Sequence, residues 1–164
     1  MSLSLGKKAP NFSLPAVQDG ELGEVELYEE LKKGSEDGIV LAFFPLAFSS
    51  VCTEELCQFR DSMSEFKDLN ARVFGISVDS PHALRAFAKE NNLGFTLLSD
   101  FNKETIEDYD VVHEELSGLK RVAKRSVFVL DENGRVKYRW VSDDPGKLPD
   151  REEIDKALGE IQAE

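Results

Sequence analysis

The sequence has few of the side chains that form disulfides or bind metals. Of its 164 residues, two are cysteine and two are histidine. We expect an intracellular chain, and there two cysteines are poor candidates for a structural disulfide. They favour catalysis, redox cycling or metal binding instead.

Positive charge is also scarce. The chain has 20 Lys and Arg against 32 Asp and Glu, which gives a net charge of -12. Nucleic-acid binding needs clustered basic residues, and anionic membranes repel an acidic surface. We therefore expect neither a nucleic acid nor a membrane as partner, and we interpret the acidic surface as an aid to solubility.

Long apolar runs are missing as well. No stretch approaches the roughly 20 residues that a membrane span needs. Residues 1–10 lack the basic and apolar regions of a secretory signal. We therefore expect a cytoplasmic location. The length suits one domain over residues 1–164, with a sizeable core.

Apolar patterns predict an α/β fold. The predicted strands are residues 11–14, 24–28, 38–44, 72–78, 96–98, 126–130 and 135–141. The predicted helices are residues 28–33, 52–69, 103–109 and 150–161, with another that starts at Pro81. The first two strands form an N-terminal hairpin. Alternating strands and helices predict one central mixed sheet with helices on both faces.

Both cysteines lie in the first turns of one predicted helix. Four apolar residues follow Cys52 at helical spacing: Leu56, Phe59, Met63 and Phe66. Cys52 therefore belongs to the core-facing stripe. Cys57 lies about 140° around the helix and about 7.5 Å along it. Because a disulfide needs Cα atoms within about 6.8 Å, a Cys52–Cys57 bond would require the first turns to unwind.

A cysteine at a helix start is a candidate nucleophile. The thiolate is the reactive form of a cysteine, and the free N–H groups and dipole of a helix N-terminus stabilise an anion. Ser49 can donate its hydroxyl to the sulfur or to a bound oxygen. Glu54 and Glu55 oppose a nearby negative charge, so a cation is required. Spacing alone does not choose among Arg60, Lys120, Arg121, Lys124 and Arg125.

One of these candidates, Arg125, immediately precedes an apolar strand, so it can sit at a strand end and point into a pocket. Ionisation of the thiol does not suffice for fast chemistry. Lowering a thiol pKa from 8.5 to about 6 raises its reactivity only about 3-fold, because nucleophilicity falls with the pKa. Charge on the departing oxygen must be stabilised too.

These residues carry a family resemblance. The segment Pro45-x-x-x-Ser49-x-x-Cys52, with Glu55 three positions later, resembles the active-site motif of the peroxiredoxins. Further similar segments follow in the family's order at residues 9–12, 74–80, 97–100 and 125–131. The resemblance implies a thioredoxin-like fold. It also implies a thiol-dependent peroxidase that reduces hydrogen peroxide and organic hydroperoxides without a cofactor or metal.

The resemblance also implies roles for single residues. Cys52 would be the peroxidatic cysteine, Pro45 would shield the pocket, and Ser49 would bond the peroxide. Glu55 would orient an arginine, and Arg125 would activate both cysteine and substrate.

The resemblance gives Cys57 a role and suggests partners. Cys57 occupies the place of the resolving cysteine in the bacterioferritin-comigratory (PrxQ-like) subgroup. Residues 45–49 look more like the one-cysteine AhpE-like branch, and the chain has no cysteine-bearing tail like that of the decameric two-cysteine class. The implied partners are a hydroperoxide substrate, a thioredoxin-like or other dithiol reductant, and a second copy in a homodimer.

Two other functions compete with this interpretation. A thioredoxin-fold metallochaperone could bind copper or zinc through Cys52, Cys57 and His113, although the C-x4-C spacing does not fit common zinc sites. A general disulfide reductase would carry a C-x-x-C motif, which this chain lacks.

Overall fold

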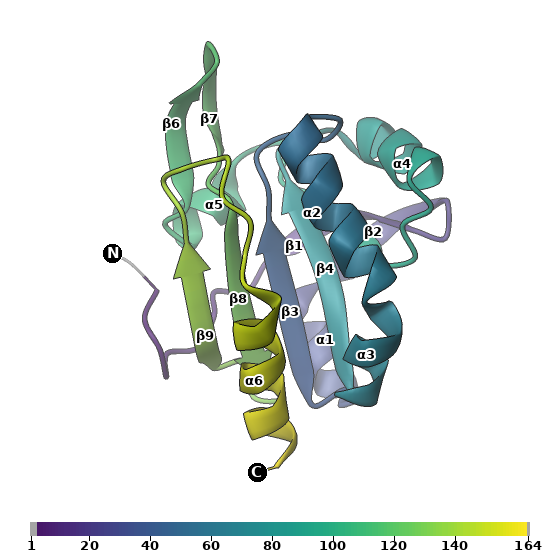
Figure 1. Ribbon diagram of the computed structural model, residues 1–164, viewed down its shortest axis with the longest axis vertical. Helices are drawn as coiled ribbons and strands as arrows, with labels where there is room; N and C mark the ends of the chain where they lie inside the picture. Colours follow the sequence, from purple (N-terminus) through teal and green to yellow (C-terminus); the bar gives the residue numbers. More distant parts are fainter. Residues whose placement is uncertain (1–2, 164) are drawn as a thin grey trace.

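A seven-stranded mixed sheet forms the centre of the structure, a computed structural model that describes residues 3–163 (Figure 1). Its strand order is β2-β1-β5-β4-β3-β8-β9. These strands are β1 Ser13–Gln18, β2 Glu21–Glu26, β3 Gly38–Phe43, β4 Ala71–Ser77, β5 Thr96–Ser99, β8 Ser126–Asp131 and β9 Val136–Val141. The helices are α1 Leu27–Lys33, α2 Ser50–Asp61, α3 Met63–Asp68, α4 Pro81–Glu90, α5 Glu104–Asp108 and α6 Arg151–Gln162. The predicted α/β, thioredoxin-like class is confirmed.

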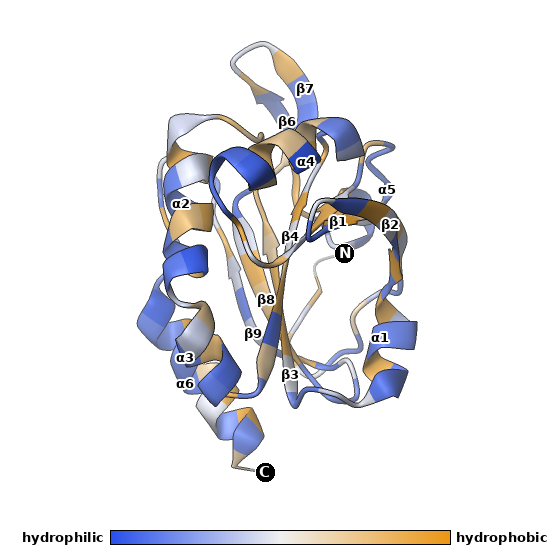
Figure 2. Cartoon of the chain, turned by 90° about the vertical axis from the view of Figure 1, so that its right-hand side faces the viewer, coloured by the Kyte–Doolittle hydropathy of each residue, from blue (hydrophilic) through white to orange (hydrophobic). Residues whose placement is uncertain are grey.

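Strand β3 separates two hydrophobic cores. Every residue of β3 is buried, as expected for a central strand covered on both faces. Leu41 and Phe43 pack with residues of α1 and α5. Val40 and Ala42 point to the other face and pack with residues of α2, α3, α4 and α6. Figure 2 shows α2, α3 and α6 on one side of the sheet and α1 on the other.

The pairing of β3 with its neighbours brings distant segments together. Strand β3 runs parallel to β4 and antiparallel to β8. Phe43, the last residue of β3, lies opposite Ser126, the first residue of β8. Arg125 therefore lies beside the loop that leaves β3 and leads into α2.

The helix predicted over residues 52–69 is wrong in one respect: it is two helices. Helix α2 begins at Ser50 and ends at Asp61, and α3 follows after Ser62. The Ser62 hydroxyl donates a hydrogen bond to the Gln58 carbonyl, 2.8 Å away. Such a bond competes with the helical ladder and bends helices. The apolar stripe nevertheless spans both helices, with Phe59 and Phe66 buried in one core.

Two hairpins show what the sequence pattern revealed and what it did not. The N-terminal hairpin, β1 with β2, is confirmed, although its strands are shifted by a few residues from the predicted ranges. A second hairpin, β6 Val112–Leu116 with β7 Leu119–Ala123, was not predicted. It forms a separate two-stranded sheet that projects beyond the end of the main sheet (Figure 1). Within residues 3–163, the helices are all too short or too polar to cross a membrane.

Candidate active site

Cys52 is the third residue of α2 and is almost fully buried, with 1% of its surface exposed. The chain reaches it from β3 through Phe44 and the buried Pro45. Ser49 is the N-cap of α2 in an extended conformation. The first N–H groups of a helix have no carbonyl partners within that helix. The Cys52 sulfur therefore lies where the backbone favours negative charge.

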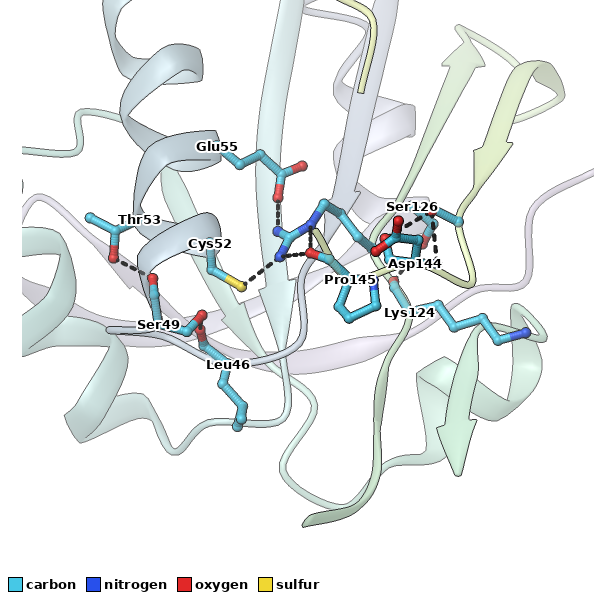
Figure 3. Close-up of polar contacts among 11 residues, drawn as sticks. Leu46, Ser49, Cys52, Thr53, Glu55, Lys124, Ser126, Asp144 and Pro145 are labelled. Atoms are coloured by element: carbon cyan, nitrogen blue, oxygen red, sulfur yellow. Dashed lines mark hydrogen bonds and ion pairs between the residues drawn. The ribbon is translucent and has the colours of Figure 1, made fainter. Parts of the chain in front are cut away.

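Arg125 is the cation beside this sulfur. Its Nη2 donates to Cys52 Sγ at 3.2 Å, and its Nη1 donates to Glu55 Oε1 at 2.6 Å (Figure 3). Nε and Nη2 also donate to the Pro145 carbonyl oxygen, at 3.1 and 2.9 Å. These contacts occupy four of the five N–H donors of the guanidinium. The side chain is thus held in one orientation, with one edge at the sulfur.

Glu55 forms a buried ion pair with Arg125. Each side chain is 1% exposed. Burial raises the pKa of Glu55 to about 7, even though Arg125 opposes this shift. Burial also disfavours the charge of Arg125, but Glu55 and Cys52 together raise the pKa of the guanidinium above its usual value. Arg125 therefore stays cationic. Glu55 Oε2 is buried and has no hydrogen-bond partner among residues 3–163.

The loop between β3 and α2 is anchored on both sides. The Ala47 N–H donates to Asp79 Oδ2 at 2.7 Å. Phe48 has a left-handed backbone, with φ of 70°, and its ring packs edge-on against Phe87 of α4 at 5.1 Å. The Ser49 hydroxyl donates to the Leu46 carbonyl at 2.9 Å. Of the two acceptors expected for the Ser49 hydroxyl, the sulfur or a bound oxygen, the Cys52 sulfur is not its partner in this structure.

A pocket of about 230 Å³ exposes the site to solvent. Its lining is formed by Pro45, Leu46, Ser49, Ser50, Val51, Cys52, Leu116, Ser117, Arg125, Pro145 and Gly146. A larger groove of about 640 Å³ lies between the β1–β2 turn and α4, and its lining includes Arg85 and Lys89 but neither cysteine. The smaller pocket combines a nucleophile with a cation, so it is the candidate active site.

Cys57 is free and points elsewhere. Its Sγ lies 3.7 Å from Asn91 Oδ1, at the end of α4. Asn91 Nδ2 donates to the Phe87 carbonyl at 3.0 Å, which turns Oδ1 toward the thiol. Arg60, the other helix-borne candidate cation, donates to the Asn91 carbonyl at 2.7 Å. Arg60 therefore belongs to the α2–α4 contact near Cys57, away from the pocket.

The remaining candidate cations and the metal ligands are dispersed. Arg121 pairs with Glu107, and Lys124 pairs with Asp143. His113 lies in the β6–β7 hairpin. Within residues 3–163, no three His, Cys, Asp or Glu side chains gather in a way that could hold a metal ion.

Two segments that contribute to the site were missed by sequence reasoning: the loop with Pro145 and the hairpin with Leu116 and Ser117. Pro145 acts through its carbonyl oxygen, a group that every residue carries, so no sequence signal reveals it. Leu116 and Ser117 come from the unpredicted hairpin. The Ser117-Gly118 pair, typical of a tight turn, was the signal that could have revealed it.

A thioredoxin-like sheet with a buried cysteine at a helix start defines a thiol-based redox protein. Comparison with known proteins gives the family. The chain matches the AhpC/TSA family over residues 5–139. It is 36% identical over 170 residues to the chloroplastic 2-cysteine peroxiredoxin of Chattonella marina var. antiqua, covering 99% of this chain and 81% of that protein.

Solved structures agree with this sequence match. The reduced 2-Cys peroxiredoxin of Plasmodium vivax has a TM-score of 0.84 and 30% identity, covering 97% of this chain and 82% of that one. Peroxidoxin BcpB of Mycobacterium tuberculosis has a TM-score of 0.79 and 29% identity, covering 98% of this chain and 97% of that one. The chain belongs to the peroxiredoxins, a family of thiol-dependent peroxidases. These relatives give no support to the metallochaperone alternative.

Proposed function

We propose that this protein reduces hydroperoxides with Cys52 as the peroxidatic nucleophile. The observation that carries the proposal is the contact between Cys52 Sγ and Arg125 Nη2 at 3.2 Å, inside a solvent-open pocket at a helix N-terminus. A fixed cation there favours the thiolate. The same guanidinium edge can stabilise negative charge that develops on the peroxide oxygens.

Ser49 serves as an acceptor in this proposal. Its hydroxyl proton is engaged by the Leu46 carbonyl, which leaves the lone pairs of Oγ available. The O–H of a hydroperoxide can donate to them, while the O–O bond lies between the Cys52 sulfur and the Arg125 guanidinium. Pro45 has no N–H and is buried at the pocket wall, so it limits the access of water.

The first step is a displacement at oxygen. The Cys52 thiolate attacks the terminal oxygen of the hydroperoxide, the O–O bond breaks, and the electron pair leaves with the alkoxide or hydroxide. A proton converts that leaving group to an alcohol or water. The sulfur is oxidised to a sulfenic acid, and the peroxide is reduced by two electrons.

Cys57 is the proposed resolving residue. The first turn of α2 unwinds, and the Cys57 thiol condenses with the Cys52 sulfenic acid to form a disulfide and water. A thioredoxin-like or other dithiol then reduces that disulfide and becomes oxidised itself. The proposed location is the cytoplasm, where a reducing environment keeps thiols free. A homodimer is also part of the proposal.

Mass spectrometry after one equivalent of hydrogen peroxide tests these assignments. Sulfenic acid at Cys52, or a Cys52–Cys57 disulfide, is the expected product. Cys52→Ser should abolish peroxide consumption, and retained consumption would contradict the role of Cys52. Cys57→Ser should block the disulfide and slow turnover with a dithiol. Unchanged turnover in that variant, with no disulfide in the wild type, would remove Cys57 from the mechanism.

A further inference from the structure

The pocket at Cys52 has a polar end, and most of its remaining wall is apolar. The polar end consists of Cys52, Ser49 and Arg125, and Ser50 and Ser117 also line the pocket. Five apolar side chains form the walls, and they come from four different segments of the chain: Pro45, Leu46, Val51, Leu116 and Pro145. A small polar molecule gains no binding free energy from apolar walls, whereas an alkyl group is stabilised by burial against them.

The volume of the pocket also favours a substrate with an alkyl group. A water molecule occupies about 30 Å³ in the liquid, and hydrogen peroxide has only one more oxygen. The pocket holds about 230 Å³. The space beyond the polar end therefore fits a compact alkyl group attached to the reacting oxygens.

Leu116, like Pro145, is a wall residue that stands outside the active-site motif. It is the last residue of β6, and it pairs with Leu119, the first residue of β7. Leu116 is half-buried and packs against the core, whereas Leu119 is 48% exposed and does not line the pocket. The hairpin thus places one leucine at the pocket and the other in solvent.

We propose that Leu116 is a specificity-determining residue. It contacts the alkyl group of an organic hydroperoxide and thereby favours alkyl hydroperoxides over hydrogen peroxide. Hydrogen peroxide lacks an apolar group, so it meets the polar end alone and gains nothing from Leu116. This inference rests on the proposed reaction of Cys52, and it adds the hairpin as the element that selects the substrate.

The test compares two oxidants in single turnover. The rate constant for oxidation of Cys52 is measured by rapid quenching and intact-mass analysis, with tert-butyl hydroperoxide and with hydrogen peroxide. Leu116→Ala should lower the ratio of the two rate constants about 5- to 10-fold, since it removes the equivalent of one or two buried methylene contacts. Leu119→Ala, in the same hairpin, should leave the ratio unchanged.

A second variant guards against misfolding. Leu116→Asn keeps the branched shape and nearly the size of the side chain and removes its apolar character, so it should also lower the ratio. A folded Leu116 variant with an unchanged ratio would overturn the role of Leu116. So would an equal loss with both oxidants, which would indicate general damage to the site. If wild-type Cys52 reacted with neither oxidant, the proposed function itself would fail, and this inference with it.

Discussion

Arg125 immediately precedes β8, and its side chain contacts α2 and lines the pocket. Truncation to Ala removes its donors from the Cys52 sulfur, Glu55 and the Pro145 carbonyl at once. We expect Arg125→Ala to lower the rate of Cys52 oxidation by at least about 100-fold, the scale of losing a donor to a developing oxyanion. Arg125→Lys should also be impaired, because one ammonium cannot reproduce the guanidinium fork. Stopped-flow peroxide consumption measures both rates.

The neighbouring residue supplies the control for Arg125. Lys124→Ala removes a cation one position away that pairs with the exposed Asp143. It should keep nearly the wild-type rate. A similar loss in Lys124→Ala would mean that net charge, not the placed guanidinium, governs the reaction.

Glu55 makes stability depend on pH. Its pKa in the folded protein is about 7, against an ordinary value of 4.5. Between these values the folded protein holds a proton that the unfolded chain releases. The free energy of unfolding therefore falls as pH rises from about 4.5 to about 7, by up to roughly 3 kcal/mol from this group. Denaturant unfolding across this range should show a steeper decline for the wild type than for Glu55→Gln.

The Glu55→Gln comparison depends on the slope with pH rather than on absolute stability. The amide also changes the contact with Arg125, which adds a constant difference at every pH. Parallel stability curves for the two proteins would contradict the raised pKa of Glu55.

At the residue scale, the site residues that lie close together in the sequence were the ones that could be predicted. Pro45, Ser49 and Cys52 are neighbours in the sequence, so their motif places them together. Arg125 lies 73 positions from Cys52, and it arrives through the pairing of β3 with β8. The predicted strand that begins after Arg125 made it one of several candidate cations, and the family resemblance singled it out, but sheet order was needed to bring it to the sulfur. The Ser49 hydroxyl orientation depends on loop geometry that residue type does not encode.

Gly75 of β4 lies where side chains of the sheet and of α2 pack closely against the strand. A Cβ added at Gly75 of β4 would lie 2.8 Å from Leu97 Cδ2 and 3.2 Å from Leu56 Cδ1 of α2. Gly75→Ala should therefore push α2 away from the sheet and destabilise the protein by about 1–3 kcal/mol, the usual range for overpacking. Thermal unfolding measures this as a lower Tm.

Gly159 provides the matched control for Gly75. It lies in α6, and an added Cβ would meet nothing within 4 Å. Gly159→Ala should raise stability by roughly 0.5–1 kcal/mol, because alanine loses less backbone entropy in a helix. If both substitutions shifted Tm alike, close packing at Gly75 would not be the cause.

At the element scale, strands and helices with a clear apolar pattern were predictable, and elements without such a pattern were not. Strands β3, β4 and β8 are nearly continuous apolar runs, and the α2–α3 stripe has helical spacing. The β6–β7 hairpin has only two fully buried residues, Val122 and Ala123, and its sequence shows no apolar alternation. The break at Ser62 also escaped prediction, because the hydroxyl that bends the helix could equally have pointed to solvent.

For the whole molecule, the proposed cycle requires the first turn of α2 to open while the sheet stays folded. Within intact α2 the two cysteines are too far apart for a disulfide and point to different neighbours. Forming the Cys52–Cys57 disulfide must break the contact of Cys52 with Arg125 and unwind the first turn of α2. It must also disturb the packing of Phe48 on Phe87 or the contact of Cys57 with Asn91. The sheet strands share none of these contacts.

Hydrogen exchange can show whether the start of α2 opens while the sheet stays folded. In the disulfide form, amides of residues 50–57 should exchange at least about tenfold faster than in the reduced form, because local opening costs far less than global unfolding. Amides of β3, β4 and β8 should keep their protection. Cys57→Ser treated with one equivalent of peroxide carries the sulfenic acid without the disulfide, so its α2 should stay protected. Equal loss of protection in that variant would assign the opening to oxidation of Cys52 alone, and loss throughout the sheet would show that the molecule opens as a whole.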